Sequence, residues 1–188
     1  MAHQGIYIAA VVMAVVMGWT SRAAATESHA AVAGQPSLMA PDARVRGVTP
    51  RFIAVINEAT VRSKTFRGLV DRISSSDGIV YVEEGQSGHG VRACLLNTVT
   101  IAGPNRVLRV LVDPQKVDRE LMRSIGHELQ HAVEVLSNRN IRSGSDMTLL
   151  YLNIVGLSLN RFETYAAIKA GNDVLTELRA SAAAERRK

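Results

Sequence analysis

The sequence contains a single cysteine, Cys94, among its 188 residues. A lone cysteine excludes an internal disulfide, so the folded chain must be stable without covalent cross-links. Cys94 lies in an apolar, strand-like run at residues 91–101, where a buried, inert thiol is far commoner than a nucleophile. We therefore do not expect cysteine chemistry to carry the function.

Aromatic residues are also scarce, at 4% of the chain. The formal net charge of +5 and the pI near 9.8 permit an acidic partner. The basic residues are scattered, however, without the interleaved aromatics or the motifs typical of nucleic-acid binding. We therefore expect no nucleic-acid partner and assign these residues to a mildly basic, solvated surface. They include Arg44, Arg46, Arg62, Arg67, Arg106, Arg109, Arg139 and Arg142.

The apolar run near the N-terminus, residues 6–17, is shorter than the roughly 20 residues of a transmembrane helix. It is followed by the small residues 23–25, a pattern that predicts a signal peptide over residues 1–25, cleaved before Thr26. The protein would then be exported, periplasmic or secreted. The alternative is a membrane anchor formed by residues 6–19. Residues 26–48, rich in Ala, Gly, Pro and Ser, are expected to form a flexible linker.

Hydrophobic periodicity predicts an α+β fold for one domain at residues 49–182. Thr49 and Pro50 are expected to begin a helix, and a second helical pattern covers residues 66–73. Three strands are expected, at 79–82, 93–101 and 107–112, with a hairpin turn at 103–105. Helices at 117–136, 147–159 and 161–182 are expected to follow, before a basic tail at 183–188. Because residues 147–159 are apolar almost all round, we expect that helix to be buried.

The helix expected at residues 117–136 carries the motif HExxH, residues 127–131. One helical turn of about 5.4 Å places His127 and His131 over the same spot, where both imidazoles can bind one zinc ion. Glu128 points to another side and is suited to act as a general base on water. Ile125 and Leu129 belong to an apolar stripe on the opposite face. The alternative is that the motif face is simply a solvated face with two ordinary histidines.

A third ligand must come from elsewhere in the chain. Glu134 shares the histidine face, but it lies seven residues from His127, about 10 Å along the axis, too far for one ion. Asp146 is better explained as a helix cap. Glu163, at the start of the last expected helix, is our predicted ligand, because an antiparallel return can bring it over both histidines. The alternative is a first-turn carboxylate favoured by the helix dipole.

His127-Glu128-Leu129-Gln130-His131, followed 32 positions later by Glu163, resembles the gluzincin branch of the zincin metallopeptidases. The order of helices, small sheet, motif helix and glutamate helix over residues 50–180 is also similar to the zincin layout. The resemblance implies one zinc ion held by two His and Glu163, water activated by Glu128, and a peptide bound antiparallel along an edge strand. Ala167 stands where thermolysin-like members have an Asp that orients a ligand histidine.

We therefore expect a zinc-dependent metallopeptidase acting on a peptide or protein substrate, with Glu128 as the catalytic base. Spacing does not single out a group that would stabilise the oxyanion: Tyr151, Tyr165 and His89 are all candidates. A competing hypothesis is a non-catalytic exported module in which zinc is structural or absent. The sequence leaves the oligomeric state and the substrate open.

Overall fold

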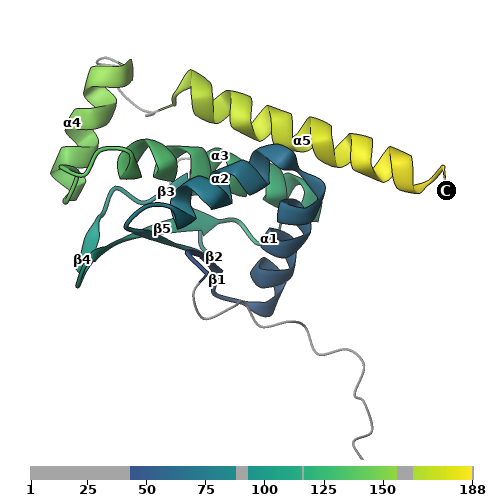
Figure 1. Ribbon diagram of the computed structural model, residues 1–188, viewed down its shortest axis with the longest axis horizontal. Helices are drawn as coiled ribbons and strands as arrows, with labels where there is room; N and C mark the ends of the chain where they lie inside the picture. The colour runs from purple at the N-terminus through teal and green to yellow at the C-terminus, as the bar shows by residue number, and fades with distance from the viewer. Residues whose placement is uncertain (1–42, 88–92, 116, 156–162, 188) are drawn as a thin grey trace, which may run out of the picture. The chain divides into compact units, whose positions relative to one another are not determined.

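The computed structural model describes residues 43–87, 93–115, 117–155 and 163–187 (Figure 1). They belong to the second of two units into which the chain divides, residues 36–188. The first unit, Met1–Gln35, lies wholly outside these ranges. The predicted signal peptide or anchor, residues 26–42 of the predicted linker, and His89 therefore also lie outside the described residues.

Within the described residues, five strands form one mixed sheet in the order β1-β2-β5-β3, with β4 also paired to β5. β1 is parallel to β2 and β2 to β5, whereas β3 and β4 run antiparallel to β5. The α+β class is thus confirmed, but the expected three strands were too few. The bounds are β1 (Val45–Gly47), β2 (Gly78–Glu84), β3 (Ala93–Leu95), β4 (Thr100–Ala102) and β5 (Asn105–Val112).

Two strand predictions need correction. Residues 45–47 were placed in the linker, yet they pair in parallel with β2 and bury Val45. Three residues are too few to show an alternating pattern, so only the neighbouring strand defines β1. The run at 93–101 forms two short strands, β3 and β4, instead of one. The expected hairpin is confirmed between β4 and β5, where Gly103 adopts φ 58°.

Two helices, α1 (Pro50–Arg62) and α2 (Lys64–Ser74), connect β1 to β2. Thr49 caps α1 as predicted, since its hydroxyl accepts a hydrogen bond from the backbone N–H of Phe52, and Pro50 is the first helical residue. Ser63 ends α1 and caps α2, accepting from the N–H of Phe66. Both helices therefore begin where their capping residues indicate.

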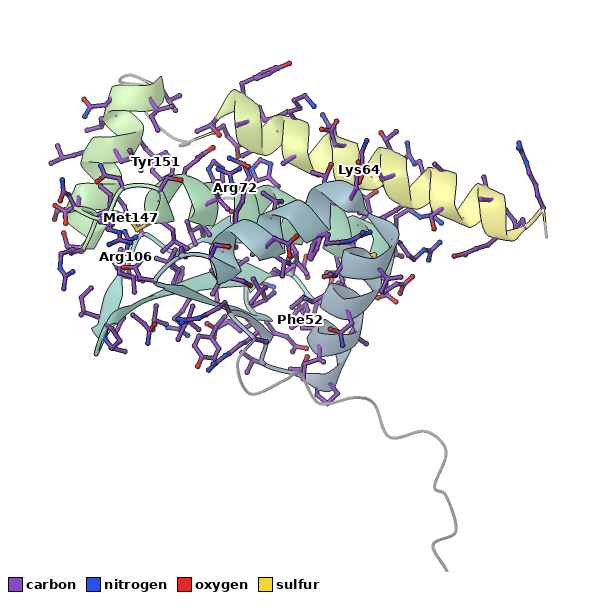
Figure 2. The ribbon with its side chains drawn as sticks, viewed as in Figure 1. Phe52, Lys64, Arg72, Arg106, Met147 and Tyr151 are labelled. Atoms are coloured by element: carbon purple, nitrogen blue, oxygen red, sulfur yellow. The ribbon has the colours of Figure 1, made fainter. Side chains whose placement is uncertain are left out.

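The helices α1, α2 and α3 (Asp118–Leu136) lie on one face of the sheet, and α5 (Tyr165–Glu185) packs along α3 (Figure 1). Alternate residues of β5 face the helices, and Leu108, Val110 and Val112 are buried there. Arg106 follows the same alternation and is only 1% exposed; Figure 2 labels it below Met147. The prediction that Arg106 belongs to the solvated surface is therefore wrong.

In the helix α4 (Gly144–Val155) only Met147 and Tyr151 are buried, which contradicts the prediction of a buried helix. Met147 and Tyr151 are buried and face the rest of the domain (Figure 2), but Leu149 is 59% and Ile154 52% exposed. Some apolar side chains of α4 are therefore not covered by any other described part of the chain. Residues 156–159, also predicted as helical, lie outside the described ranges.

The last helix, α5, is shifted relative to the prediction of residues 161–182. It begins after its N-cap, Thr164, and continues to Glu185, into the predicted basic tail. In the described ranges, no helix combines the length and the apolar character needed to cross a membrane.

Candidate metal centre

The HExxH motif lies on α3, which is buried on nearly all sides. The predicted apolar stripe is confirmed, because Ile125 and Leu129 are fully buried. The motif face is covered as well: Glu128 and His131 are each only 6% exposed, against β3 and α5. The alternative of a solvated face is therefore wrong, and burial of two ionisable side chains on it calls for specific partners.

Small residues let α5 approach α3 closely at the motif. A Cβ atom on Gly171 of α5 would lie 3.3 Å from the Cβ atom of His127, and one on Gly126 of α3 would lie 2.9 Å from Cγ2 of Val174. Side chains at these two positions would separate the helices. The absence of a side chain at Gly126 and Gly171 thus allows α5 to pack directly against the turns of α3 that carry Gly126 and His127.

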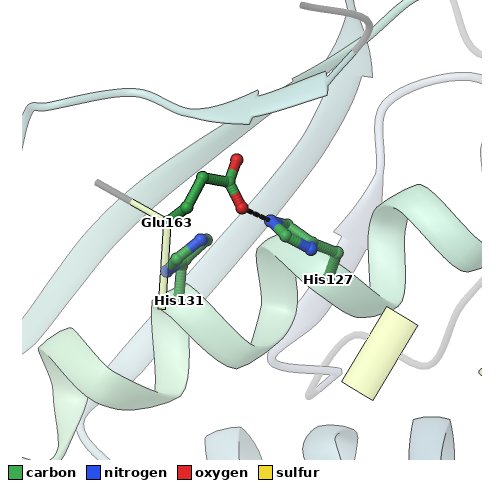
Figure 3. Close-up of side chains that lie close together, drawn as sticks. All are labelled: His127, His131 and Glu163. Carbon is green, nitrogen blue, oxygen red and sulfur yellow. Dashed lines mark ion pairs between the residues drawn. The ribbon is translucent and has the colours of Figure 1, made fainter. Parts of the chain in front are cut away.

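His127, His131 and Glu163 converge at one point (Figure 3). Nε2 of His127 lies 3.2 Å from Oε2 of Glu163, and one ligand atom from each of the three residues lies within 4.8 Å of the others. Ligand atoms around a tetrahedral zinc ion, with bonds of about 2.0–2.1 Å, lie roughly 3.3 Å apart. This group could therefore hold a metal ion after a small closing movement.

Glu163 reaches the histidines from a position different from the one predicted. It precedes the N-cap Thr164 and so lies just outside α5, not in its first turn. The alternative explanation, a first-turn carboxylate favoured by the helix dipole, loses its basis. The side chain of Glu163 is 41% exposed, so this ligand position is open to solvent.

Glu128 lies beside the three residues without joining them. Its Oε2 accepts a hydrogen bond of 2.7 Å from the backbone N–H of Leu95 in β3, and its Oε1 lies 4.0 Å from Nε2 of His127. Burial raises the pKa of Glu128 above its ordinary value, although both histidines and the Leu95 N–H favour the charged form. A carboxylate with a raised pKa is a stronger base than an ordinary glutamate and is therefore better suited to accept a proton from water.

The surroundings of His127 are dominated by carboxylates. Burial favours the neutral ring, but the hydrogen bond with Glu163 and the nearby Glu128 carboxylate outweigh it and raise the pKa of His127. Two carboxylates thus face two imidazoles in a largely buried space. The donor set of two nitrogens and one carboxylate oxygen is one that zinc accepts.

The chain matches no family model, no curated protein and no solved structure in the comparisons made. The site must therefore be interpreted from its own geometry.

Among the other candidates, Tyr151 is placed behind His131. Its hydroxyl donates to the backbone carbonyl of His131 at 3.3 Å, and the two rings pack edge to face at 5.5 Å. Tyr151 thus supports the histidine, and Tyr165 is 80% exposed.

The prediction that Asp146 caps the next helix needs correction, because α4 begins at Gly144 and Asp146 lies inside its first turn. The hydroxyl of Ser143 accepts the hydrogen bond from the N–H of Asp146, and the carboxylate of Asp146 in turn accepts from the N–H of Arg142.

Cys94 is half-buried in β3, next to Leu95, and its sulfur is hydrogen-bonded to the hydroxyl of Ser87. Burial raises the pKa of the Cys94 thiol, although the Ser87 hydrogen bond opposes the shift. A raised pKa disfavours the nucleophilic thiolate, but the side chain is only half-buried and not buried as predicted.

Sequence reasoning missed the role of Glu134, which it considered only as a ligand. Oε2 of Glu134 lies 3.0 Å from Nδ1 of His131, and Oε1 accepts hydrogen bonds from Thr164 and Gln130. The spacing of three residues between His131 and Glu134 was a signal, because side chains three apart meet on a helix. Burial opposes ionisation of Glu134, but these hydrogen bonds outweigh it and lower its pKa.

Proposed function

We propose that the chain is a zinc-dependent metallopeptidase of the gluzincin type, with His127, His131 and Glu163 as metal ligands and Glu128 as the general base. The observation that carries the proposal is the convergence of the three ligand atoms within 4.8 Å, beside a buried carboxylate that is not one of them. A purely structural zinc site has no need for such a carboxylate, whereas hydrolysis requires a base.

The position of β3 supports a zincin-like arrangement. β3 ends the sheet order, runs antiparallel to β5 and packs against α3. Its Leu95 N–H reaches Glu128, so this strand passes directly beside the proposed centre. An extended peptide lying along β3 would therefore have its backbone near Glu128 and the histidines.

Zinc bound by the three residues would polarise a peptide carbonyl and lower the pKa of water at its open position. Glu128 takes the proton from the attacking water and passes it to the leaving amine. The Leu95 N–H holds Oε2 of Glu128, which leaves Oε1, 4.0 Å from Nε2 of His127, as the oxygen facing the centre. Burial keeps bulk water from solvating the carboxylate and maintains its raised pKa.

Replacement of Glu128 by Gln tests this function. The amide retains an oxygen that can accept from Leu95 but cannot take up a proton, so Glu128→Gln should bind zinc as wild type does. Hydrolysis of an unstructured protein such as casein should fall by about 10²–10⁴-fold. Zinc content by elemental analysis and cleavage by mass spectrometry provide the two measurements, with Glu120→Gln, at the start of the same helix, as the control.

Two results would count against the peptidase. Unchanged hydrolysis in Glu128→Gln would show that another group is the base. Stoichiometric zinc in the wild type without cleavage of any peptide in a diverse library would favour the alternative, a non-catalytic exported zinc-binding or interaction module.

We also propose that the enzyme acts outside the cytoplasm, on the strength of the signal-like residues 1–25. N-terminal sequencing of the protein recovered from expressing cells tests this part. A mature chain beginning at Thr26 would agree with export and cleavage. Retention of residues 6–19 in a membrane fraction would indicate the anchored form.

A further inference from the structure

Glu134 connects elements that are far apart in the sequence. It lies on α3, three residues after His131, and its Oε2 is 3.0 Å from Nδ1 of that ring. Its Oε1 accepts a hydrogen bond of 2.7 Å from the hydroxyl of Thr164 and one of 3.3 Å from the amide of Gln130. Only 13% of its side chain is exposed. The carboxylate therefore has partners on both oxygens.

Thr164 is the N-cap of α5 and immediately follows Glu163. Its Oγ1 accepts from the N–H of Ala167 at 3.1 Å and donates its proton to Glu134. Thr164 is 5% exposed, so water cannot readily replace Glu134 as the acceptor. The two hydrogen bonds of this hydroxyl therefore connect the beginning of α5 to α3, beside the proposed metal centre.

We propose that Glu134 is a positioning residue that holds two of the three predicted ligands, His131 directly and Glu163 through Thr164. The inference rests on the proposed function, since it assigns the residue that prepares the same metal centre.

The reason lies in the two ring nitrogens of His131. When Nδ1 carries the proton and donates it to Glu134, the lone pair on Nε2 is the one directed to the centre. Tyr151 packs edge to face against the same ring and limits its rotation. Without Glu134, His131 can exchange tautomers or turn, and Thr164 loses the acceptor of its buried hydroxyl. Both changes weaken preorganisation of the site for a metal ion.

The test measures zinc affinity of the full chain by competition with a chromophoric chelator. Glu134→Gln should weaken zinc binding by about 10–100-fold. Thr164→Val should weaken it by about 10-fold, and Thr164→Ser, which keeps the hydroxyl, should restore affinity to within about 3-fold of wild type. Because Thr164 acts through Glu134, the double variant Glu134→Ala, Thr164→Val should bind no more than about 3-fold weaker than Glu134→Ala alone.

Matched controls separate positioning from general stability. Glu177 lies on α5, roughly 20 Å along the helix axis from Thr164, and likewise accepts from hydroxyl groups, those of Ser63 and Thr65. Thr49 is an N-cap like Thr164, but of α1. Glu177→Gln and Thr49→Val should lower the free energy of unfolding while leaving zinc affinity unchanged. Equal affinity of wild type and Glu134→Gln, or equal losses in the controls, would overturn the inference.

A second readout needs no metal. Imidazole ¹⁵N NMR of the metal-free chain should show His131 protonated at Nδ1 in wild type and a mixture of tautomers in Glu134→Ala. Protonation at Nε2 in the wild type would refute the positioning role whether or not zinc binds. Conversely, an Nδ1–H tautomer in a wild type that binds no zinc would refute the proposed function and leave the Glu134 contact established.

Discussion

At the scale of single residues, Arg106 is the most heavily engaged side chain among the described residues. Its guanidinium pairs with both carboxylate oxygens of Asp77. It also donates to carbonyls at the end of α3 and in the loop that follows, those of Val135, Leu136, Asn138 and Ile141. A cation at a helix C-terminus satisfies carbonyls that lack helical partners and complements the helix dipole. Arg106 therefore fixes the end of the helix that carries the metal motif.

Arg106→Met should lower the free energy of unfolding by about 3–5 kcal/mol, because it leaves Asp77 and several buried carbonyls without their donor. The matched control is Arg109→Met on the same strand. Arg109 pairs with Glu83 at the surface, and its side chain is 52% exposed, so its loss should cost less than about 1 kcal/mol. Urea denaturation of the metal-free chain gives both values. Similar losses in the two variants would contradict the role assigned to Arg106.

The residues of the site differ in how far sequence could identify them. The HExxH motif could be recognised from the sequence because His127, Glu128 and His131 lie within five consecutive residues of one helix. Glu163 could be placed near them by excluding the other acidic candidates. Glu134 and Arg106 were misjudged for a common reason. Their importance depends on Thr164 and on the carbonyls after Val135, which become neighbours only in the folded chain.

At the scale of elements, the contact between α3 and α5 positions the residues that we propose as metal ligands. Gly126 and Gly171 lie in this contact, where the opposing helix leaves little room for a side chain. Nearer the C-terminal end of α5, the carboxylate of Glu177 accepts hydrogen bonds from Ser63 and from Thr65 of α2. The helix bearing the N-cap next to Glu163 is thus held at more than one point.

Two glycine substitutions test this packing. In Gly126→Ala the new Cβ would lie 2.9 Å from Cγ2 of the buried Val174, so we expect a loss of about 1–3 kcal/mol despite the better helix propensity of Ala. Gly68→Ala in α2 meets nothing within 4 Å and should gain about 0.5–1 kcal/mol. Thermal and urea unfolding of both variants measure these changes in the free energy of unfolding. Stabilisation by both substitutions would mean that the helices are not in tight contact at Gly126.

Element predictions succeeded where a local signal exists. Thr49 with Pro50, and the apolar stripe of α3, specify helix starts and faces by their own chemistry. They failed where tertiary context decides. The strand β1 is too short to show a hydrophobic pattern, so it was missed. The helix α4 is apolar, yet Leu149 and Ile154 are exposed. Composition alone does not reveal which parts of the chain will pack against a helix, so the prediction of a buried helix failed.

At the scale of the whole domain, the sheet and its helices explain why the histidine face is buried. α3 lies between the sheet and α5, so its motif face is covered and Glu128 has a raised pKa. The α+β class could be predicted from the order of periodic segments. The parallel pairing of β1, β2 and β5 could not, since pairing of strands distant in sequence is not encoded in any single segment.

Acid should destabilise the domain through carboxylates distributed across it. The Arg106 hydrogen bond lowers the pKa of Asp77, the Arg109 hydrogen bond lowers that of Glu83, and for Glu177 hydrogen bonds from Ser63 and Thr65 outweigh burial. Lowered pKa values mean that the unfolded chain binds protons first as the pH falls. The stabilisation is therefore fully present above the ordinary pKa values, 4.5 for the two glutamates and 3.8 for Asp77, and it is lost as the pH falls through the lowered pKa values of the folded chain.

We expect the free energy of unfolding of the metal-free chain to decrease as the pH is lowered below 4.5, and we expect Asp77→Asn to reduce the slope of this decrease below pH 3.8. Urea denaturation of wild type and Asp77→Asn at a series of pH values measures how the free energy of unfolding depends on pH. The surface pair of Glu83 and Arg109 should contribute less at high salt, whereas the contribution of Asp77 should persist, because Arg106 is buried. Identical slopes for wild type and Asp77→Asn would contradict this account of acid sensitivity.

The central claim is that His127, His131 and Glu163 bind one zinc ion. Crystals of the zinc-loaded full chain, measured on both sides of the zinc absorption edge, test it most directly. We predict one anomalous peak about 2.0–2.2 Å from a ring nitrogen of each histidine and from a carboxylate oxygen of Glu163. A peak at other residues, or none at these three despite saturating zinc, would contradict the claim.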